Sequence, residues 1–254
     1  MIIDADCHIS PFADGIPINN LLSRMNRARV DKSITWLQPG YYRDVEQGNT
    51  YVAEAARLHP DRVIPFGWVD PHQGYAASID TIHRCIESYG FPGVKLNGAQ
   101  NEFYIDDEQI SIPLIDEIVH AGILLAFHIG TDAYEYTHPF RLGKIAQRYP
   151  EARILAVHMG GVAHRDLTNV MIEIAARYPN ITLIGSSVKS KPILAAIKKL
   201  GAHRVCFSSD TPFEIMHVEV ARYNALLDGE VDDREKELVL GRNVENLLNL
   251  IYKN

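Results

Sequence analysis

Eight short, β-prone apolar runs, separated by stretches with helical periodicity, predict an α/β protein with a (β/α)8 TIM barrel fold. The runs end near His8, Gln38, Asp70, Asn97, His128, His158, Ser186 and Asp210. Successive ends lie 24 to 32 residues apart, which fits the roughly 30-residue βαβ unit. A doubly wound open sheet is the alternative, but no Gly-x-Gly-x-x-Gly turn follows the first run to indicate dinucleotide binding.

Most of the runs are preceded by a helix-like stretch that stops at a Pro or a Gly, as in Tyr149-Pro150 and Leu200-Gly201. Glycine supplies the left-handed residue that ends a helix, and proline cannot continue one. The runs themselves are almost continuously apolar, as expected of strands that are buried on both faces of a parallel sheet. Helical spacing is clear in the intervening stretches, for example at Ile79, Ile82 and Ile86.

The stretch after the last run is expected to complete the barrel. Residues 212–227 are predicted to form the eighth helix, and residues 232–252 a C-terminal helix packed on the outside. A chain of 254 residues is near-minimal for such a barrel. Since no linker or low-complexity segment divides it, we expect a single domain over residues 1–254.

Composition excludes several classes of function. A net charge of −7 argues against a nucleic-acid binder, which needs a basic face. No apolar run approaches the roughly 18 residues of a membrane span, and the N-terminus lacks a signal-peptide pattern. Three cysteines cannot form a disulfide framework and suit a reducing compartment. We therefore expect a cytoplasmic protein that binds neither nucleic acid nor membrane.

Polar side chains gather at the ends of four of the predicted strands. The first strand carries Asp4-x-Asp6-x-His8, and the others end at His128, His158 and Asp210. Residues i and i+2 of a strand share a face, and barrel active sites lie at the carboxyl ends of the strands. Burying so many ionisable groups costs several kcal/mol each unless they are compensated. A divalent cation would compensate the carboxylates and use the imidazoles as ligands, whereas the alternative is a satisfied polar core.

Six segments in order along the chain carry a family resemblance. They are Ile2-Ile-Asp-Ala-Asp-Cys-His8, Gly93-Val-Lys-Leu96, Ala126-Phe-His128, Ala156-Val-His-Met-Gly-Gly161, Phe207-Ser-Ser-Asp-Thr-Pro212 and Gly241-Arg-Asn-Val-Glu-Asn-Leu-Leu248. Together they resemble the amidohydrolase superfamily over essentially the whole chain. The similarity is to the branch that includes aminocarboxymuconate-semialdehyde decarboxylase, γ-resorcylate decarboxylase and small lactone hydrolases.

The resemblance implies a role for each strand-end residue. His8, His128 and Asp210 match metal ligands, Asp210 also matches the proton acceptor, and His158 matches a residue that assists catalysis or binds a second metal. Asp6 stands where many relatives have the first His of His-x-His, and an oxygen ligand shifts preference toward manganese without excluding zinc. We therefore expect one divalent ion, zinc or manganese, on Asp6, His8, His128 and Asp210, with a second ion as an open alternative.

Two cationic residues are candidates for substrate binding. Lys95 has three interpretations: a carbamylated ligand that bridges two metals, a cation that anchors a substrate carboxylate, or an ion-pair partner inside the barrel. Arg165, in the loop after the sixth strand, could bind an anionic substrate through two hydrogen bonds, although a surface position is an equal alternative.

The leading functional hypothesis is a metal-dependent hydrolase. Metal-activated water would attack the carbonyl of a small amide, lactone or ester, with or without a carboxylate group, with Asp210 as base and His158 stabilising the oxyanion. The alternative is a non-oxidative decarboxylase of a small aromatic or muconate-type carboxylic acid on the same metal site. Decarboxylases of the branch tend to be longer, so this near-bare barrel favours hydrolysis. A non-catalytic binding barrel is the third hypothesis, and a homodimer is possible because branch relatives are often dimers.

Overall fold

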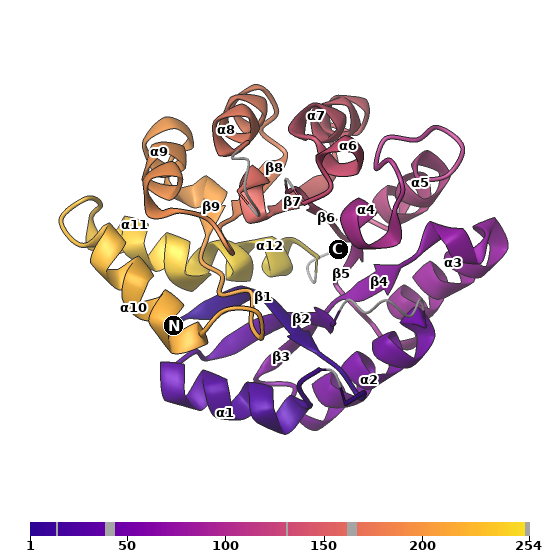
Figure 1. The fold of residues 1–254 in the computed structure, drawn as a ribbon, viewed down its shortest axis with the longest axis horizontal. Coiled ribbons are helices and arrows are strands. Elements are labelled where there is room, and N and C mark those ends of the chain that lie inside the picture. Colours follow the sequence, from indigo (N-terminus) through magenta and orange to yellow (C-terminus); the bar gives the residue numbers. More distant parts are fainter. Residues whose placement is uncertain (14, 39–43, 131, 162–166, 252–254) are drawn as a thin grey trace.

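The computed structural model describes residues 1–13, 15–38, 44–130, 132–161 and 167–251. It confirms the predicted (β/α)8 TIM barrel, with parallel strands surrounded by a ring of helices (Figure 1). The strands are β1 (Ile3–Ile9), β2 (Lys32–Leu37), β3 (Val63–Pro65), β4 (Gly67–Val69), β5 (Gly93–Leu96), β6 (Leu124–His128), β7 (Arg153–Val157), β8 (Ile181–Ile184) and β9 (Val205–Cys206). Each paired neighbour runs parallel, as a chain of βαβ units requires.

Nine labelled strands occupy eight positions because β3 and β4 are two halves of one barrel strand, separated at Phe66. The ring closes between the first and last strands. There Ala5 N donates to Phe207 O at 3.2 Å, and His8 N donates to Thr211 O at 2.7 Å. This closure places residues from the two ends of the sequence side by side.

The outer ring is formed by α1 (Ile18–Ala28), α2 (Val45–Leu58), α3 (Tyr75–His83), α5 (Ile112–His120), α7 (Pro139–Arg148), α8 (Thr168–Arg177), α9 (Ser190–Leu200) and α10 (Met216–Leu227). Two short helices, α4 (Gly98–Asn101) and α6 (Tyr134–Thr137), lie in loops that follow β5 and β6. Among the described residues, none of the helices has the length and apolarity that a membrane crossing needs.

The C-terminal stretch packs outside the barrel, as predicted. It forms α11 (Asp233–Glu237), a π-helical turn (Leu238–Arg242) and α12 (Asn243–Ile251). Helix α12 contacts β1 and β9. The eighth outer helix begins at Met216 rather than at residue 212, because a turn bonded from Phe213 N to Asp210 O at 2.8 Å comes first. That turn carries Phe213 back over the end of β1, where its ring centroid lies 5.5 Å from that of His8.

A bulge in β1 corrects one sequence prediction. Asp4 pairs with Ser33 of β2, but Cys7 pairs with Thr35, so three steps along β1 match two along β2. Ser33 and Thr35 share a face, since their hydroxyl oxygens lie 2.9 Å apart. Asp4 and Cys7 therefore share a face as well, and the prediction that Asp4 shares a face with Asp6 and His8 is wrong.

Asp4 instead joins β1 to the segment that follows β9. Its Oδ1 accepts hydrogen bonds from Ser209 N at 2.9 Å and from Ser208 Oγ at 3.2 Å. The same oxygen accepts from Asp6 N at 3.2 Å. Asp4 thus binds the backbone of β1 and the backbone of the segment after β9. The second contact, at Ser209, lies immediately before Asp210.

Candidate metal centre

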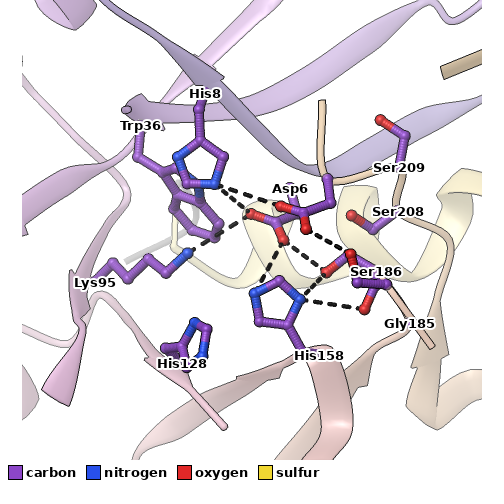
Figure 2. Close-up of polar contacts among 12 residues, drawn as sticks. Asp6, His8, Trp36, Lys95, His128, His158, Gly185, Ser186, Ser208 and Ser209 are labelled. Carbon is purple, nitrogen blue, oxygen red and sulfur yellow. Dashed lines mark hydrogen bonds and ion pairs between the residues drawn. The ribbon is translucent and has the colours of Figure 1, made fainter. Parts of the chain in front are cut away.

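Three buried side chains converge at the closure of the barrel. Asp6 and His8 come from β1 and Asp210 follows β9, and their candidate ligand atoms all lie within 4.8 Å of one another. His8 Nε2 is 3.3 Å from Asp6 Oδ1 and 3.8 Å from Asp210 Oδ1. Figure 2 shows Asp6 and His8 facing each other at the end of β1. Two carboxylates and one imidazole are a donor set suited to a divalent ion.

The ring of His8 is fixed in one tautomer by its neighbours. Its Nδ1 lies 2.8 Å from the carbonyl oxygen of Leu37, which can only accept, so Nδ1 carries the proton. The Trp36 indole N–H donates to Nε2 at 3.0 Å, which requires the same tautomer. Nε2 thus offers a lone pair on the side of the carboxylates, and an ion bound there would take the place of the indole N–H.

The charges at this site are poorly balanced within the protein. Oδ1 of Asp6 is buried and lacks a hydrogen-bond partner among the described residues. Burial would raise the pKa of Asp6, but the Lys95 ammonium, 3.7 Å from Oδ1, and the imidazoles of His8 and His158 lower it below its ordinary range. Burial and the charge of Asp6 raise the pKa of Asp210 to about 7. A divalent cation fits this site because it would satisfy the orphaned oxygen and stabilise both carboxylates.

Two serines after β8 hold the remaining carboxylate oxygens. Ser186 Oγ donates to Asp6 Oδ2 at 2.6 Å, and Ser187 Oγ donates to Asp210 Oδ2 at 2.6 Å. Ser186 Oγ also lies 3.0 Å from Nδ1 of His158. Neither serine was predicted from the sequence as part of the site, because serine is an ordinary residue in turns.

Three residues around the site have left-handed backbones although none is glycine. The φ angles are +66° at His158, +53° at Ser187 and +61° at Asp210. Such residues are strained and persist only where the surrounding structure holds them, and they cluster at functional sites. Each turns the chain sharply where it leaves a barrel strand.

His128 and His158 lie against each other beside the three-residue group, with ring centroids 4.6 Å apart. His158 Nε2 is 3.9 Å from Asp6 Oδ2, and burial lowers the pKa of His158 to about 4. His128 stands outside the group, and its Nε2 donates to Asp132 Oδ1 at 2.9 Å. Its role as a metal ligand stays a prediction, since ligation through Nε2 would have to displace Asp132.

Asp132 is a residue that the sequence analysis missed. It lies in the loop after β6, in a chain segment without a strand-end signal. Burial would raise the pKa of Asp132, but the hydrogen bond from His128 lowers it to about 2. The carboxylate is therefore ionised at neutral pH and holds the proton of His128 on Nε2.

Lys95 is almost completely buried, with 1% of its surface exposed. Its Nζ lies 3.9 Å from the ring centroid of Trp36 and 5.2 Å from that of Trp68. Burial lowers the pKa of Lys95, against the charges of Asp6 and Asp210. The contact with Asp6 supports the ion-pair interpretation, and the position of Lys95 on the pocket wall is compatible with a role as substrate anchor. Arg165, the other candidate for substrate binding, lies outside the described residues.

A pocket of about 240 Å³ opens directly onto these groups. Eight of its nine lining residues carry charged or polar groups, and Phe213 supplies an apolar wall. The lining residues are His8, Lys95, Asn97, Gln100, His128, Asp132, His158, Asp210 and Phe213.

Comparison with known proteins identifies the relatives of this chain. A family model described as amidohydrolase matches residues 3–250. The chain is 25% identical over 234 residues to γ-resorcylate decarboxylase of a Rhizobium species, covering 73% of this chain and 71% of the relative. It is 25% identical over 274 residues to 2-amino-3-carboxymuconate-6-semialdehyde decarboxylase of Dictyostelium discoideum, covering 90% and 76%.

A solved structure with the same fold is a dihydroxybenzoic acid decarboxylase from Polaromonas, with bound manganese and the inhibitor 2-nitroresorcinol. The TM-score is 0.76 at 19% identity, over 98% of this chain and 97% of that one.

These relatives overturn the leading functional hypothesis. They are decarboxylases, so the expectation of a hydrolase is wrong and the alternative is better supported. The expectation rested on chain length, although the sequence match covers 71% and 76% of the two curated decarboxylases. Length fails as a signal because the candidate metal site is built from strand ends rather than from added loops.

The raised pKa of Asp210 predicts a pH-dependent stability of the metal-free protein. Asp210 titrates near 7 when folded and near its ordinary 3.8 when unfolded, so the folded state retains a proton that the unfolded chain loses. This contribution lowers the free energy of unfolding as pH rises, by up to about 1.4 kcal/mol per pH unit. The buried His128 and His158, whose pKa values are lowered by burial, contribute with the opposite sign below pH 6.5. The test therefore follows the difference in free energy of unfolding between an Asp210 variant and wild type as pH changes.

Urea unfolding with a chelator present should show Asp210→Asn gaining stability over wild type as pH rises from 5 to 7. Asp106→Asn is the matched control. Burial would raise the pKa of Asp106, but Lys144 and Arg141 hold it below its ordinary value, so Asp106 is ionised in both states over this range. Its stability difference from wild type should stay constant. A constant difference for Asp210→Asn as well would show that Asp210 is already ionised in the folded protein at pH 5.

Proposed function

The chain belongs to the amidohydrolase family whose model matches residues 3–250, and on this premise we propose that it is a metal-dependent, non-oxidative decarboxylase of a small hydroxylated aromatic carboxylic acid. One divalent ion, manganese in preference to zinc, would be held by Asp6, His8 and Asp210, with His128 as a further ligand. Manganese is favoured because two of the three converging ligands are carboxylate oxygens. A bound ion would act as a Lewis acid on substrate oxygens and stabilise the negative charge that develops as CO₂ leaves.

The observation that carries the proposal is the position of Asp210 in the pocket. Decarboxylation breaks a carbon–carbon bond, and the electron pair stays on the ring carbon, which must then take up a proton. Asp210 lines the pocket. Burial and the charge of Asp6 raise its pKa to about 7 in the metal-free protein, and the negative charge of a bound substrate would oppose the lowering of this pKa by an ion. The carboxyl would give its proton to the ring carbon and regain one from solvent, so that the acid R–COO⁻ plus H⁺ becomes R–H plus CO₂.

The protonation state of His158 favours a substrate that carries a ring hydroxyl. Its Nδ1 faces the carbonyl oxygen of Ser186 at 3.2 Å and therefore carries the proton. The lone pair is then on Nε2. Since the lowered pKa of about 4 keeps the ring neutral, Nε2 can accept a hydrogen bond from a ring hydroxyl. Decarboxylation of γ-resorcylate by the Rhizobium relative is consistent with this substrate class.

Lys95 is proposed to bind the carboxylate of the substrate. It is the cationic side chain that lines the pocket among the described residues. Its stem is buried and its ammonium rests on Trp36, so little side-chain freedom is left to lose on binding. An anion held there would lie beside the groups that take part in the reaction.

The reaction itself can be tested directly with purified, manganese-loaded protein. We expect CO₂ release from one or more acids in a panel of mono- and dihydroxybenzoates and a muconate semialdehyde acid. In D₂O one deuterium should appear at the carbon that carried the carboxylate.

Asp210→Asn should lower kcat by about 10²–10⁴-fold, because the proton donor is lost. Asp106→Asn, which removes a carboxylate that pairs with Arg141 and Lys144, is the control and should keep full activity. Absence of CO₂ with every acid, or turnover of amides and lactones instead, would refute the proposal.

The role of Lys95 is separable from that of the metal ligands. Lys95→Met keeps the apolar stem and removes the charge, so KM for the acid should rise about 10-fold or more with a smaller change in kcat. Lys144→Met, which removes an exposed lysine paired with Asp106, should leave KM unchanged. If Lys95 only balances the charge of Asp6, the variant would show altered manganese affinity with an unchanged KM. Activity that depends on added bicarbonate would instead indicate a carbamylated lysine.

A further inference from the structure

Two adjacent residues after β8 each bind one carboxylate of the candidate metal centre. Ser186 is fully buried and donates to Asp6 Oδ2, and Figure 2 shows it between Asp6 and His158. Ser187 donates to Asp210 Oδ2. At 2.6 Å both contacts are short, as expected when a hydroxyl donates to a charged oxygen. Neither serine is among the three residues that converge as candidate ligands.

The hydrogen bonds from Ser186 and Ser187 leave the other oxygen of each carboxylate for the ion. Oδ1 of Asp6 lacks a hydrogen-bond partner among the described residues and lies 3.3 Å from His8 Nε2. Oδ1 of Asp210 lies 3.8 Å from the same nitrogen. The Oδ1 atoms of Asp6 and Asp210 thus both lie near Nε2 of His8, while the Oδ2 atoms accept the serine hydrogen bonds.

The backbone of β8 and its following turn fixes where these hydroxyls lie. The Tyr223 hydroxyl donates to Gly185 O at 2.8 Å, and a Cβ at Gly185 would lie 2.0 Å from the same hydroxyl oxygen. The close approach of this tyrosine therefore anchors the chain immediately before Ser186. Ser187 then adopts its left-handed conformation and reaches Asp210, which is also left-handed.

The geometry points to Ser186 and Ser187 as positioning residues that make Asp6 and Asp210 bind the ion through one oxygen each. The inference rests on the metal site proposed above. A carboxylate with one oxygen held by a hydroxyl cannot turn to bind the ion through both oxygens without breaking that bond. One-oxygen binding keeps the number of protein ligands low, so that coordination positions stay available for two substrate oxygens. The serines would thereby set both metal affinity and the capacity to bind the substrate.

The test compares metal binding in variants that lose or keep each hydroxyl. Ser186→Ala and Ser187→Ala should each weaken Mn²⁺ binding about 10–100-fold in calorimetric titration, as is usual when a partner of a metal ligand is lost. With Co²⁺ in place of Mn²⁺, the visible spectrum should change, because it reports the number and geometry of ligands. Ser186→Thr keeps the hydroxyl and should restore affinity and spectrum. Ser33→Ala removes a buried hydroxyl bonded to Thr35, away from the site, and should match wild type.

A further variant separates the hydroxyl from the backbone. Ser187→Gly removes the hydroxyl but tolerates the left-handed conformation, so it should bind Mn²⁺ as weakly as Ser187→Ala. It also serves if Ser187→Ala fails to fold. Wild-type affinity and an unchanged Co²⁺ spectrum in the alanine and glycine variants would overturn the positioning role alone. Weaker binding with an unchanged Co²⁺ spectrum would overturn one-oxygen binding. A wild-type protein that binds neither ion would overturn the proposed function together with this inference.

Discussion

The burial of two carboxylates beside one imidazole is the constraint on which the rest of the site depends. Asp6 and Asp210 are taken out of water within a few ångströms of each other, an arrangement that is costly unless positive charge or hydrogen bonds compensate it. Lys95 supplies part of the charge, and Ser186 and Ser187 supply the hydrogen bonds. Of the three converging residues as the structure describes them, Asp6 keeps one buried oxygen without a hydrogen-bond partner. A divalent cation is the simplest group that completes this balance.

The barrel creates this constraint by joining the two ends of the sequence. Residues of β1 and residues after β9 are about two hundred positions apart, yet hydrogen bonds between them close the ring. The bulge in β1 turns Asp4 to the other face, where it binds the backbone that leads into Asp210. The same strand therefore supplies two ligands and the support for a third. The residues that close the barrel therefore also position the candidate metal ligands.

The sequence predicted the elements well because their signals are local. Apolar runs, Gly and Pro breaks and helical spacing depend on neighbouring residues, and all eight strand positions were located from them. The strand-end residues Asp6, His8 and Asp210 were found in the same way. Contacts between distant residues were not readable: the bulge that removes Asp4 from the site, the bond from His128 to Asp132, and the serines after β8. The reaction was misjudged because chain length carries no information about which bond a metal site helps to break.

The most direct test of the account is to locate the metal by X-ray diffraction with anomalous scattering at the manganese edge. The account predicts one strong peak, with Asp6 Oδ1, His8 Nε2 and Asp210 Oδ1 as ligands at about 2.0–2.3 Å, distances usual for such nitrogen and oxygen ligands, and with His128 as a further ligand. Ser186 and Ser187 should remain hydrogen-bonded to the other two carboxylate oxygens. A peak elsewhere in the barrel, or no peak in crystals grown with excess manganese, would contradict the central claim. The two carboxyl groups would then have to be stabilised by a shared proton.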